Sequence, residues 1–164
     1  MTTAKRPFHT ASDAEIKSGE VCDVYFERTV EILRHRNDRK SVKAEIYLKS
    51  LPDDWQWGIL AGIEEAALLL EGLPVGVSAM DEGSVFEPYQ PVMVIEGTYV
   101  DWAPYETALL GLLCQASGIA TKAARCKKAA GERQVISFGA RRMHPTLAPM
   151  IERNAFIGAV TGSR

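Results

Sequence analysis

Two adjacent arginines, Arg141 and Arg142, are the residues of this 164-residue sequence whose type and position best suit chemistry. They follow residues 136–138, which have the composition of a short buried strand. Functional groups of α/β proteins gather beyond the carboxyl ends of strands, and a guanidinium fork matches carboxylate and phosphate oxygens. Gly139 and Ala140 are small enough for a ligand to approach the backbone. The segment therefore predicts an anion-binding site, and the alternative is an ordinary solvated arginine pair.

The composition limits the kind of protein to which such a site belongs. Hydrophobic residues make up 46% of the chain and charged residues 24%, and the net charge of −2 gives no field that would attract nucleic acid or an anionic membrane. The longest uncharged stretch, residues 107–121, is too short to cross a bilayer, and no apolar run follows Lys5 and Arg6 as a secretory leader requires. The three cysteines form no Cys-x-x-Cys pair, which argues against a zinc site or a disulfide framework. We therefore expect a cytoplasmic protein without metal ligands that binds neither nucleic acid nor membranes.

The first 97 residues predict helices and a small antiparallel or mixed sheet. Ser12 and Glu15 have the spacing of a capping box, so a short helix is expected to end near Gly19, and Asp23 is expected to begin a second helix that runs to residue 35. Strands are predicted over residues 41–48, 75–79, 84–87 and 92–96, and a further helix over residues 59–71.

The pattern changes after residue 97. Residues 104–118 predict a helix that is apolar on almost every side and therefore buried, and residues 119–130 are helical with basic side chains until Gly131 ends them. A strand to residue 138 and a helix over residues 145–158 follow. This order begins a βα repeat, whose parallel sheet needs further units.

These elements predict an α/β (α+β) fold in two parts. Residues 1–131 are expected to form a first part, a small sheet with its helices. Residues 132–164 are expected to supply the first strand and helix of an incomplete βα repeat.

Four stretches together resemble the nicotinate phosphoribosyltransferases. They are residues 95–97, 105–109, 116–121 and 138–142, and the likeness extends to residues 11–12 and 23–26, so that it covers nearly all of the chain. The order and spacing of the stretches make the resemblance specific, since Ser-Gly-Ile-Ala-Thr alone would be weak. It is strongest to the archaeal and bacterial type, and the same motifs also resemble the related quinolinate phosphoribosyltransferases.

The resemblance implies a type II phosphoribosyltransferase of NAD biosynthesis that joins nicotinate to 5-phosphoribosyl 1-pyrophosphate. It implies that residues 1–131 form an N-terminal α/β sandwich domain with its helices, and that residues 132–164 are the start of a truncated α/β barrel. The active site would lie at the barrel mouth, where the neighbouring subunit of a homodimer or higher homo-oligomer completes it. The resemblance also implies Mg²⁺ bound with 5-phosphoribosyl 1-pyrophosphate, and ATP hydrolysis coupled through a phosphorylated histidine. The motif of that histidine is not in this sequence, and His144 does not match it. This chain by itself is therefore expected to be incomplete and inactive.

Carried over by motif, the family pattern places the pyridine ring of the substrate between two aromatic side chains. Tyr25 would reach in from the partner subunit, and Phe138 would lie on the other face of the ring. Arg141 is implied as the catalytic residue and would hold the nicotinate carboxylate or the phosphoribosyl group, while Arg142 and His144 would meet phosphate or ribose. The residues alone leave simpler alternatives open: core positions for Tyr25 and Phe138, a solvated Arg142, and a helix cap for His144.

Two departures favour nicotinate over quinolinate. Quinolinate enzymes have Glu-Arg-Thr-Ala-Leu where this chain has a glutamate, Glu106, in place of the arginine that helps to bind the dicarboxylate. A carboxylate there would repel a second carboxylate of the substrate. Residues 139–142 likewise differ from the Asp-Thr-Arg-Lys of the quinolinate enzymes. A quinolinate phosphoribosyltransferase-like enzyme and a non-catalytic interaction module remain the alternatives, and nicotinamide stays open as the substrate.

Overall fold

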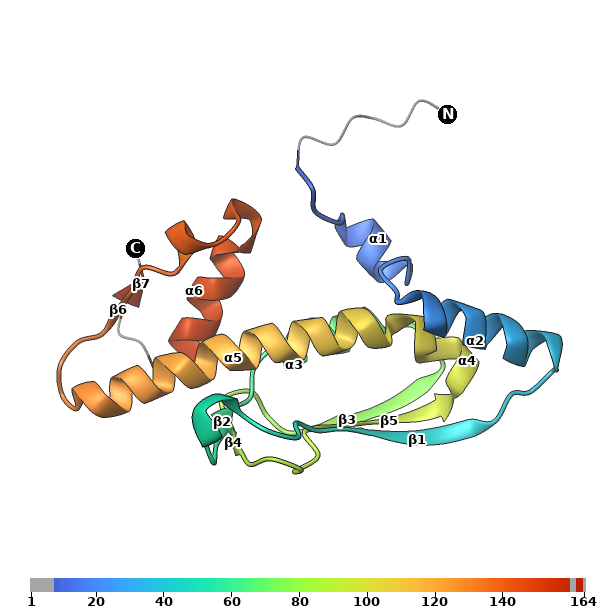
Figure 1. Cartoon of the computed structure of the whole chain (residues 1–164), viewed down its shortest axis with the longest axis horizontal. Helices are drawn as coiled ribbons and strands as arrows, with labels where there is room; N and C mark the ends of the chain where they lie inside the picture. The colour runs from blue at the N-terminus through green and yellow to red at the C-terminus, as the bar shows by residue number, and fades with distance from the viewer. Residues whose placement is uncertain (1–7, 160–161, 164) are drawn as a thin grey trace.

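One long helix runs through the middle of the molecule, and the other parts of the structure pack around it. The computed structural model describes residues 8–159 and 162–163, and its longest element is α5 (Glu106–Ala130). A three-stranded sheet packs against the first half of α5, and a short β–α–β unit packs against the second half (Figure 1). This arrangement confirms the predicted mixed α+β fold.

The sheet is antiparallel and has the order β1–β5–β3. Its strands are β1 (Ser41–Ile46), β5 (Met93–Thr98) and β3 (Val75–Ala79). Half-buried and exposed side chains alternate along β1, so the predicted wet face is confirmed, although the strand stops two residues earlier than expected. A separate two-stranded ribbon is made by β2 (Gly58–Ile59) and β4 (Val85–Phe86).

The main core lies between this sheet and the helices that cover it. Its fully buried members come from α3 (Ile63–Leu70), β5, α4 (Tyr99–Trp102) and α5, and are Ala66, Leu69, Leu70, Met93, Ile95, Trp102, Leu109 and Leu113. Burying a large apolar side chain contributes about 1.5–3 kcal/mol. The core therefore accounts for most of what holds the sheet to α5. The turn of α4 was not predicted.

Two short N-terminal helices follow the sequence closely. In α1 (Asp13–Lys17) the Ser12 and Glu15 side chains form the predicted capping box, and α2 (Val24–His35) buries Phe26 and Val30 against residues of α4 and the turn after it. The predicted apolar face of the second helix is thus confirmed.

The largest departure from the predicted elements is at residues 58–62. The apolar pattern predicted a helix from residue 59, but Gly58–Ile59 is a strand, and α3 begins only at Ile63. Within α3, Ala66 faces the core and Ala67 is exposed.

Hydroxyl groups of α5 explain why residues 59–61 are extended. The backbone N–H of Ile59 donates to Thr121 Oγ1 at 2.8 Å, and that of Ala61 donates to Ser117 Oγ at 3.1 Å. Two hydroxyls one helical turn apart thus take the place of a neighbouring strand. The backbone at Gly62 also lies close to α5, since a Cβ there would lie 2.8 Å from the Leu112 carbonyl oxygen. The Ser-Gly-Ile-Ala-Thr motif therefore has a structural role.

The helix predicted in two stretches over residues 104–130 is a single helix, α5, after a 3₁₀ turn at Ala103–Tyr105. Gly118 lies inside it without interrupting it. Burial on every side is wrong, since Leu110 is 43% exposed and Cys114 is exposed. Among the described residues no helix is both long enough and apolar enough to cross a membrane.

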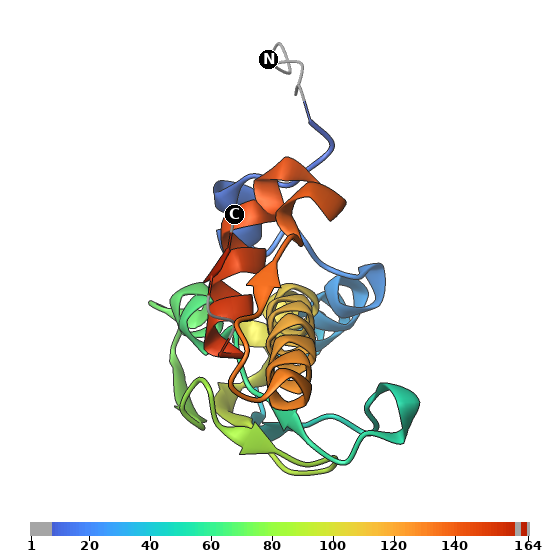
Figure 2. The same cartoon turned by 90° about the vertical axis from the view of Figure 1, so that its left-hand side faces the viewer.

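The C-terminal elements form a parallel β–α–β unit. They are β6 (Ile136–Ser137), the 3₁₀ turns η3 (Ala140–Arg142) and η4 (Pro145–Leu147), α6 (Ala148–Ile157) and β7 (Gly162–Ser163). β6 pairs with β7 in parallel, which confirms the predicted start of a βα repeat. Figure 2 looks nearly along α5 and shows α6 beside it. The two helices approach closely because residue 158 is glycine: a Cβ there would meet the Ala120 carbonyl oxygen and lie 2.6 Å from Ala123 Cβ.

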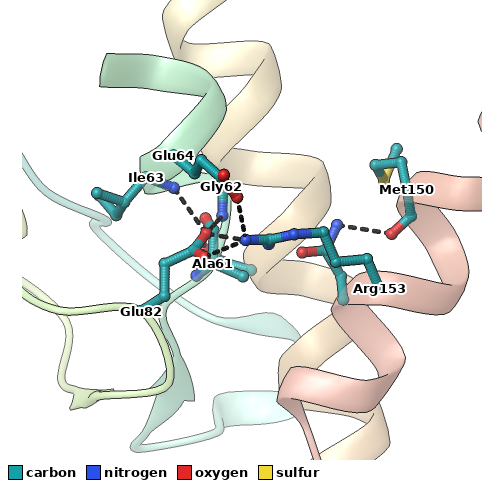
Figure 3. A network of polar contacts seen from close by, with 9 residues as sticks. Ala61, Gly62, Ile63, Glu64, Glu82, Met150 and Arg153 are labelled. Atoms are coloured by element: carbon teal, nitrogen blue, oxygen red, sulfur yellow. Dashed lines mark hydrogen bonds and ion pairs between the residues drawn. The ribbon is translucent and has the colours of Figure 1, made fainter. Parts of the chain in front are cut away.

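A polar network, which we call the Arg153 network, joins α6 to the start of α3 (Figure 3). Arg153 Nη2 donates to Glu64 Oε2 at 2.5 Å and to Glu82 Oε2 at 2.6 Å. Glu82 Oε1 in turn accepts the backbone N–H of Gly62 at 2.6 Å and of Ile63 at 3.0 Å. Burial by itself would raise the pKa of Glu82, but the hydrogen bonds from Arg153, Gly62 and Ile63 outweigh it and lower that pKa below its ordinary value. One carboxylate therefore caps α3 and holds α6.

Candidate functional site

The structure brings Phe138 and Arg141 together beyond the carboxyl end of β6. The strand ends at Ser137, so the prediction that Phe138 belongs to it is wrong, and the chain turns into η3 instead. The guanidinium carbon of Arg141 lies 4.8 Å from the centre of the Phe138 ring. Phe138 is 50% exposed, and Arg141 is exposed. The cation thus lies over the aromatic ring, and both side chains are open to solvent.

The glycine before this turn is required by packing and not by a ligand. A Cβ at Gly139 would lie 2.7 Å from Ile151 Cγ2 of α6. Ile151 is only 4% exposed, because the turn lies on it. The expectation that Gly139 leaves room for a ligand is therefore wrong, and its small size seats the arginine turn on α6.

The two arginines face different surroundings. Arg142 lines a cavity of about 320 Å³ between α5, β6 and α6, and Lys122 and Cys126 of α5 line the same cavity. The remaining walls are mostly apolar, while Phe138 and Arg141 do not contribute to them. Lys122 is exposed and belongs to the basic stretch that the sequence predicts as a helix over residues 119–130. Helical spacing shows which residues share a face, but it does not show that β6 and α6 fold back beside that face.

His144 acts as a cap in this structure. Its Nδ1 accepts the backbone N–H of Thr146 at 3.3 Å and lies 2.7 Å from Thr146 Oγ1. The ring also packs edge-on against Phe8, with 5.6 Å between the ring centres. A contact of His144 with phosphate or ribose stays a prediction, and Nε2 is the nitrogen that such a contact would use.

Tyr25 lies in the first turn of α2 and is not a core residue. Its side chain is 57% exposed, and its ring packs on Phe26 with 4.1 Å between the ring centres. The start of α2 is fixed to the start of α5, because Thr107 Oγ1 accepts the Asp23 N–H at 3.0 Å and donates to Asp23 Oδ2 at 3.1 Å. Asp23 thus stands at the predicted N-cap position, but its carboxylate binds Thr107 and not the helix.

Glu106 opens α5 close to Tyr25. Its side chain is half-buried, and burial raises the pKa of this carboxyl group. Burial and then the charge of Glu106 also raise the pKa of Tyr99, which places the carboxylate near that ring. Among the described residues Glu106 forms no ion pair. Pairing with Lys122 is excluded by helix geometry, since sixteen residues of α5 rise about 24 Å.

The candidate site residues lie at opposite halves of α5. Tyr25 and Glu106 adjoin its first turn, whereas Phe138, Arg141 and Arg142 adjoin its second half (Figure 1). A helix of 25 residues is about 37 Å long. The structure therefore brings Phe138 and Arg141 together, and it does not bring Tyr25 to them within one chain.

Comparisons with known proteins relate this arrangement to the phosphoribosyltransferases of pyridine nucleotides. Residues 23–117, more than half of the chain, match the family model described as "Quinolinate phosphoribosyl transferase, N-terminal domain". The chain belongs to this family, and the resemblance to the nicotinate and quinolinate phosphoribosyltransferases is confirmed.

Individual relatives are named as a nicotinate-nucleotide pyrophosphorylase or as nicotinate phosphoribosyltransferases. The crystal structure of a nicotinate-nucleotide pyrophosphorylase from Pyrococcus furiosus is 56% identical, with a TM-score of 0.95 over 97% of this chain and 41% of that chain. A nicotinate phosphoribosyltransferase from Dictyostelium discoideum is 32% identical over 81% of this chain and 22% of its own length. One from Mycobacterium tuberculosis is 26% identical over 80% of this chain and 35% of its own length. The chain thus spans less than half the length of these relatives.

Proposed function

We propose that the protein is a nicotinate phosphoribosyltransferase, which joins nicotinate to 5-phosphoribosyl 1-pyrophosphate to give nicotinate mononucleotide and pyrophosphate. The observation that carries this proposal is the Arg141 guanidinium 4.8 Å from the Phe138 ring centre, beyond the carboxyl end of β6. Nicotinate is a flat, electron-poor aromatic acid with one carboxylate. Such a ligand needs a stacking surface and one bidentate cation, and this pair offers both. The names of the Dictyostelium and Mycobacterium relatives support the choice of substrate.

In this proposal the pyridine nitrogen displaces pyrophosphate from the anomeric carbon of the ribose, while positive charge develops on the sugar. The protein contributes chiefly by positioning the two substrates and by electrostatic stabilisation. Arg141 holds the carboxylate and thereby orients the nitrogen, and Arg142 and His144 meet phosphate or ribose oxygens. Among the described residues no group of three or more His, Cys, Asp and Glu side chains is placed to hold a metal ion. Mg²⁺ bound with the pyrophosphate of the substrate is part of the proposal, as is ATP as a coupled energy source.

The site is proposed to be shared between two copies of the chain. Tyr25 is exposed beside the first turn of α5, whereas the arginine turn lies beside residues 119–126 of that helix, about 20–30 Å further along. A homodimer or higher homo-oligomer would bring Tyr25 of one copy over the ring that stacks on Phe138 of another.

Substitution of the two residues tests the pocket in an active preparation of the whole protein. Phe138→Ala should raise the KM for nicotinate about five-fold or more, because one stacking face is worth roughly 1 kcal/mol. Arg141→Ala should raise it about ten-fold or more, since a hydrogen bond to a charged group is worth about 1.5–3 kcal/mol. Phe156→Ala is the matched control, because Phe156 is 76% exposed on α6. Parent-like KM values in both site variants would show that nicotinate binds elsewhere.

A mixing experiment tests the shared site. Tyr25→Ala and Arg141→Ala chains, each impaired alone, should recover activity when mixed, because some hybrid sites then receive both intact residues. Absence of recovery after subunit exchange, checked with differently tagged chains, would argue against a contribution of Tyr25 across the interface.

Quinolinate is the second candidate substrate, because the matching family model is named for the quinolinate enzymes. Glu106 would discriminate between nicotinate and quinolinate, because its half-buried carboxylate would repel the second carboxylate of quinolinate. The interaction of two charges about 4 Å apart is on the order of 1–4 kcal/mol between water and a protein surface. Glu106→Arg should therefore make quinolinate a tighter competitive inhibitor of nicotinate turnover, and Glu106→Gln should have an intermediate effect. An unchanged inhibition constant would mean that Glu106 does not face the ligand.

A further inference from the structure

Three cations and two indole rings gather on the second half of α5. The guanidinium carbon of Arg125 lies 4.0 Å from the ring centre of Trp55 and 4.2 Å from that of Trp57. Lys122 Nζ lies 5.1 Å from the Trp55 ring centre, and Lys128 Nζ lies 5.4 Å from that of Trp57. The three basic residues are spaced three apart and therefore follow one side of the helix. We call these five residues the α5 basic cluster.

Arg125 is the fixed centre of this cluster. It is half-buried, and its Nη2 donates to the Trp57 carbonyl oxygen at 3.0 Å. Its Nε is buried without a hydrogen-bond partner among the described residues. The two indoles hold this cation in place, because cation–π contacts are worth about 0.5–2 kcal/mol.

No described carboxylate neutralises the three positive charges. The ion pairs between described residues lie elsewhere, at Arg39, Lys40, Lys43 and Arg153. Asp53 and Asp54 directly precede Trp55 in the sequence, yet neither forms an ion pair with the cluster. The cluster is thus a local excess of positive charge on a chain whose net charge is −2.

The chemistry of the cluster restricts its ligand. Each indole already has two cations within 5.4 Å of its ring centre, so little of either ring is left for a planar ligand. What faces solvent are the exposed Lys122 and Lys128, which offer only N–H donors. Their six-residue separation corresponds to about 9 Å along the helix, which one carboxylate cannot bridge. The ligand must therefore be a compact anion with several charges.

We propose that the α5 basic cluster binds the phosphate chain of a small di- or triphosphate. Phosphate oxygens are acceptors only and carry the several charges that three cations require. Lys122 also lines the cavity beneath Arg142, so a fourth cation lies next to the cluster. Phe138 and Arg141 lie outside that cavity. The proposal therefore uses neither of the two side chains that would hold the nicotinate ring and its carboxylate.

Inorganic tripolyphosphate is the probe that tests this site on the 164-residue chain. Trp55 and Trp57 are two of the three tryptophans, and the third, Trp102, is 3% exposed in the core. Intrinsic fluorescence therefore reports mainly on the cluster. We expect a saturable change with half-saturation below about 1 mM at an ionic strength of about 0.15 M, weakening as salt is raised.

Paired variants decide the location of the anion. The double variant Lys122→Met with Lys128→Met should bind tripolyphosphate at least ten-fold more weakly, and both positions are exposed on a helix that tolerates methionine. Lys40→Met is the matched control, since Lys40 lies before β1 and pairs with Asp38. Equal affinity in the double variant and the control would overturn the proposal.

A further variant separates this site from the candidate active site. If Arg142→Met weakens binding and the double lysine variant does not, the phosphate lies in the cavity beneath η3 and the proposal is wrong. Phe138→Ala should leave tripolyphosphate binding unchanged, whatever it does to nicotinate. Failure of the nicotinate proposal and failure of this one are therefore distinguishable.

Discussion

The two structures that dock on α5 are held to it by different forces. The sheet region, with β1, β3, β5 and helices α3 and α4, shares the main apolar core with the first half of α5, and α2 adds a smaller apolar cluster against α4 and the turn after it. The β6–α6–β7 unit has strands of two residues each, and α6 packs on α5 through small residues, at Gly158 and between Ala155 and Ala123. The Arg153 network ties α6 to the start of α3 and not to α5. Phe138, Arg141 and Arg142 belong to this second unit.

Because of this difference, the substitutions that lower the stability of the fold should not be the same as those that move the candidate site. A substitution in the sheet region should change the free energy of unfolding of the whole chain, because that region contains most of the buried apolar side chains. A substitution at the contacts of α6 should move the arginine turn while most of the fold persists, since local opening draws on the elements with the fewest buried contacts. Each of the following experiments tests one side of this contrast.

The largest effect is expected in the core of the sheet region. Leu109→Ala should lower the free energy of unfolding by about 2–5 kcal/mol, because Leu109 is fully buried and leaves a cavity. Its neighbour Leu110 is 43% exposed and provides the control, since Leu110→Ala on the same helix should cost less than about 1 kcal/mol. Urea unfolding followed by circular dichroism measures both. Equal losses of unfolding free energy in the two variants would show that the two faces of α5 contribute alike to stability.

A smaller effect is expected where α5 supports the extended segment. Thr121→Val keeps the shape of the side chain but removes the acceptor of the Ile59 N–H, and an unsatisfied buried donor costs about 1–3 kcal/mol. Amide hydrogen exchange should speed up at Ile59 and Ala61 before it does in β5. If exchange at these amides stays at the parent rate, the hydroxyls of α5 do not hold the segment in solution.

The Arg153 network should contribute about 1 kcal/mol, because Arg153 and Glu64 are 42% and 64% exposed and exposed ion pairs are weak. Arg153→Met should therefore increase amide exchange in β6 and α6 while leaving β5 protected. Glu64→Gln, which removes only the more exposed partner, should have a smaller effect. Uniform destabilisation of the sheet and α6 would show that the two regions unfold as one unit.

The difference in unfolding free energy between the parent and Arg153→Met should change with pH in a defined direction. The pKa of Glu82 is lowered in the folded chain, so its contribution is complete above the ordinary glutamate pKa of about 4.3 and is lost as the pH falls through the lower folded value. Parent and Arg153→Met should therefore differ at neutral pH and converge in acid. A difference that persists in strong acid would mean that Glu82 is not the group involved.

The smallest effect is expected at the Tyr25 end of the molecule. Burial raises the pKa of Glu106, so the folded chain favours the protonated form, and stability falls as the pH rises through the folded value. The position at the start of α5 partly offsets this, because a helix N-terminus favours a carboxylate. Glu106→Gln should stabilise the chain at neutral pH by roughly a few tenths of a kcal/mol and leave it unchanged in acid. Destabilisation at neutral pH would reveal a favourable partner for this carboxylate.

The sequence predicts elements well where one local signal decides them. The capping box at Ser12, the alternation of β1 and the helix stop at Gly131 are all found as expected. Residues 59–62 were assigned to a helix because their apolar pattern is ambiguous. Their extended form depends on Ser117 and Thr121, more than fifty residues away, and on the Glu82 cap of α3. No local pattern contains those contacts.

The candidate site, too, could be predicted only where neighbouring residues in the sequence decide its position. That an arginine pair would follow a short parallel strand could be predicted from neighbouring residues, and the structure places it there. That Arg141 lies over Phe138 while Arg142 lines a cavity with Lys122 depends on how η3 lies on Ile151. The roles of Tyr25, Phe138, Arg141, Arg142 and His144 stay predictions, as does the domain division after residue 131.

The uninterrupted α5 has a consequence for how such a protein can change its length. Each residue added to an α-helix turns everything beyond it by about 100° and moves it by about 1.5 Å. One inserted residue in α5 would therefore rotate the rows that contact α6 away from those that contact the sheet. Seven added residues, close to two full turns, would restore the rotation but carry the arginine turn about 10 Å further from Tyr25. Viable insertions should consequently fall in loops, such as residues 47–57 and 131–135, whereas the number of residues in α5 should stay constant.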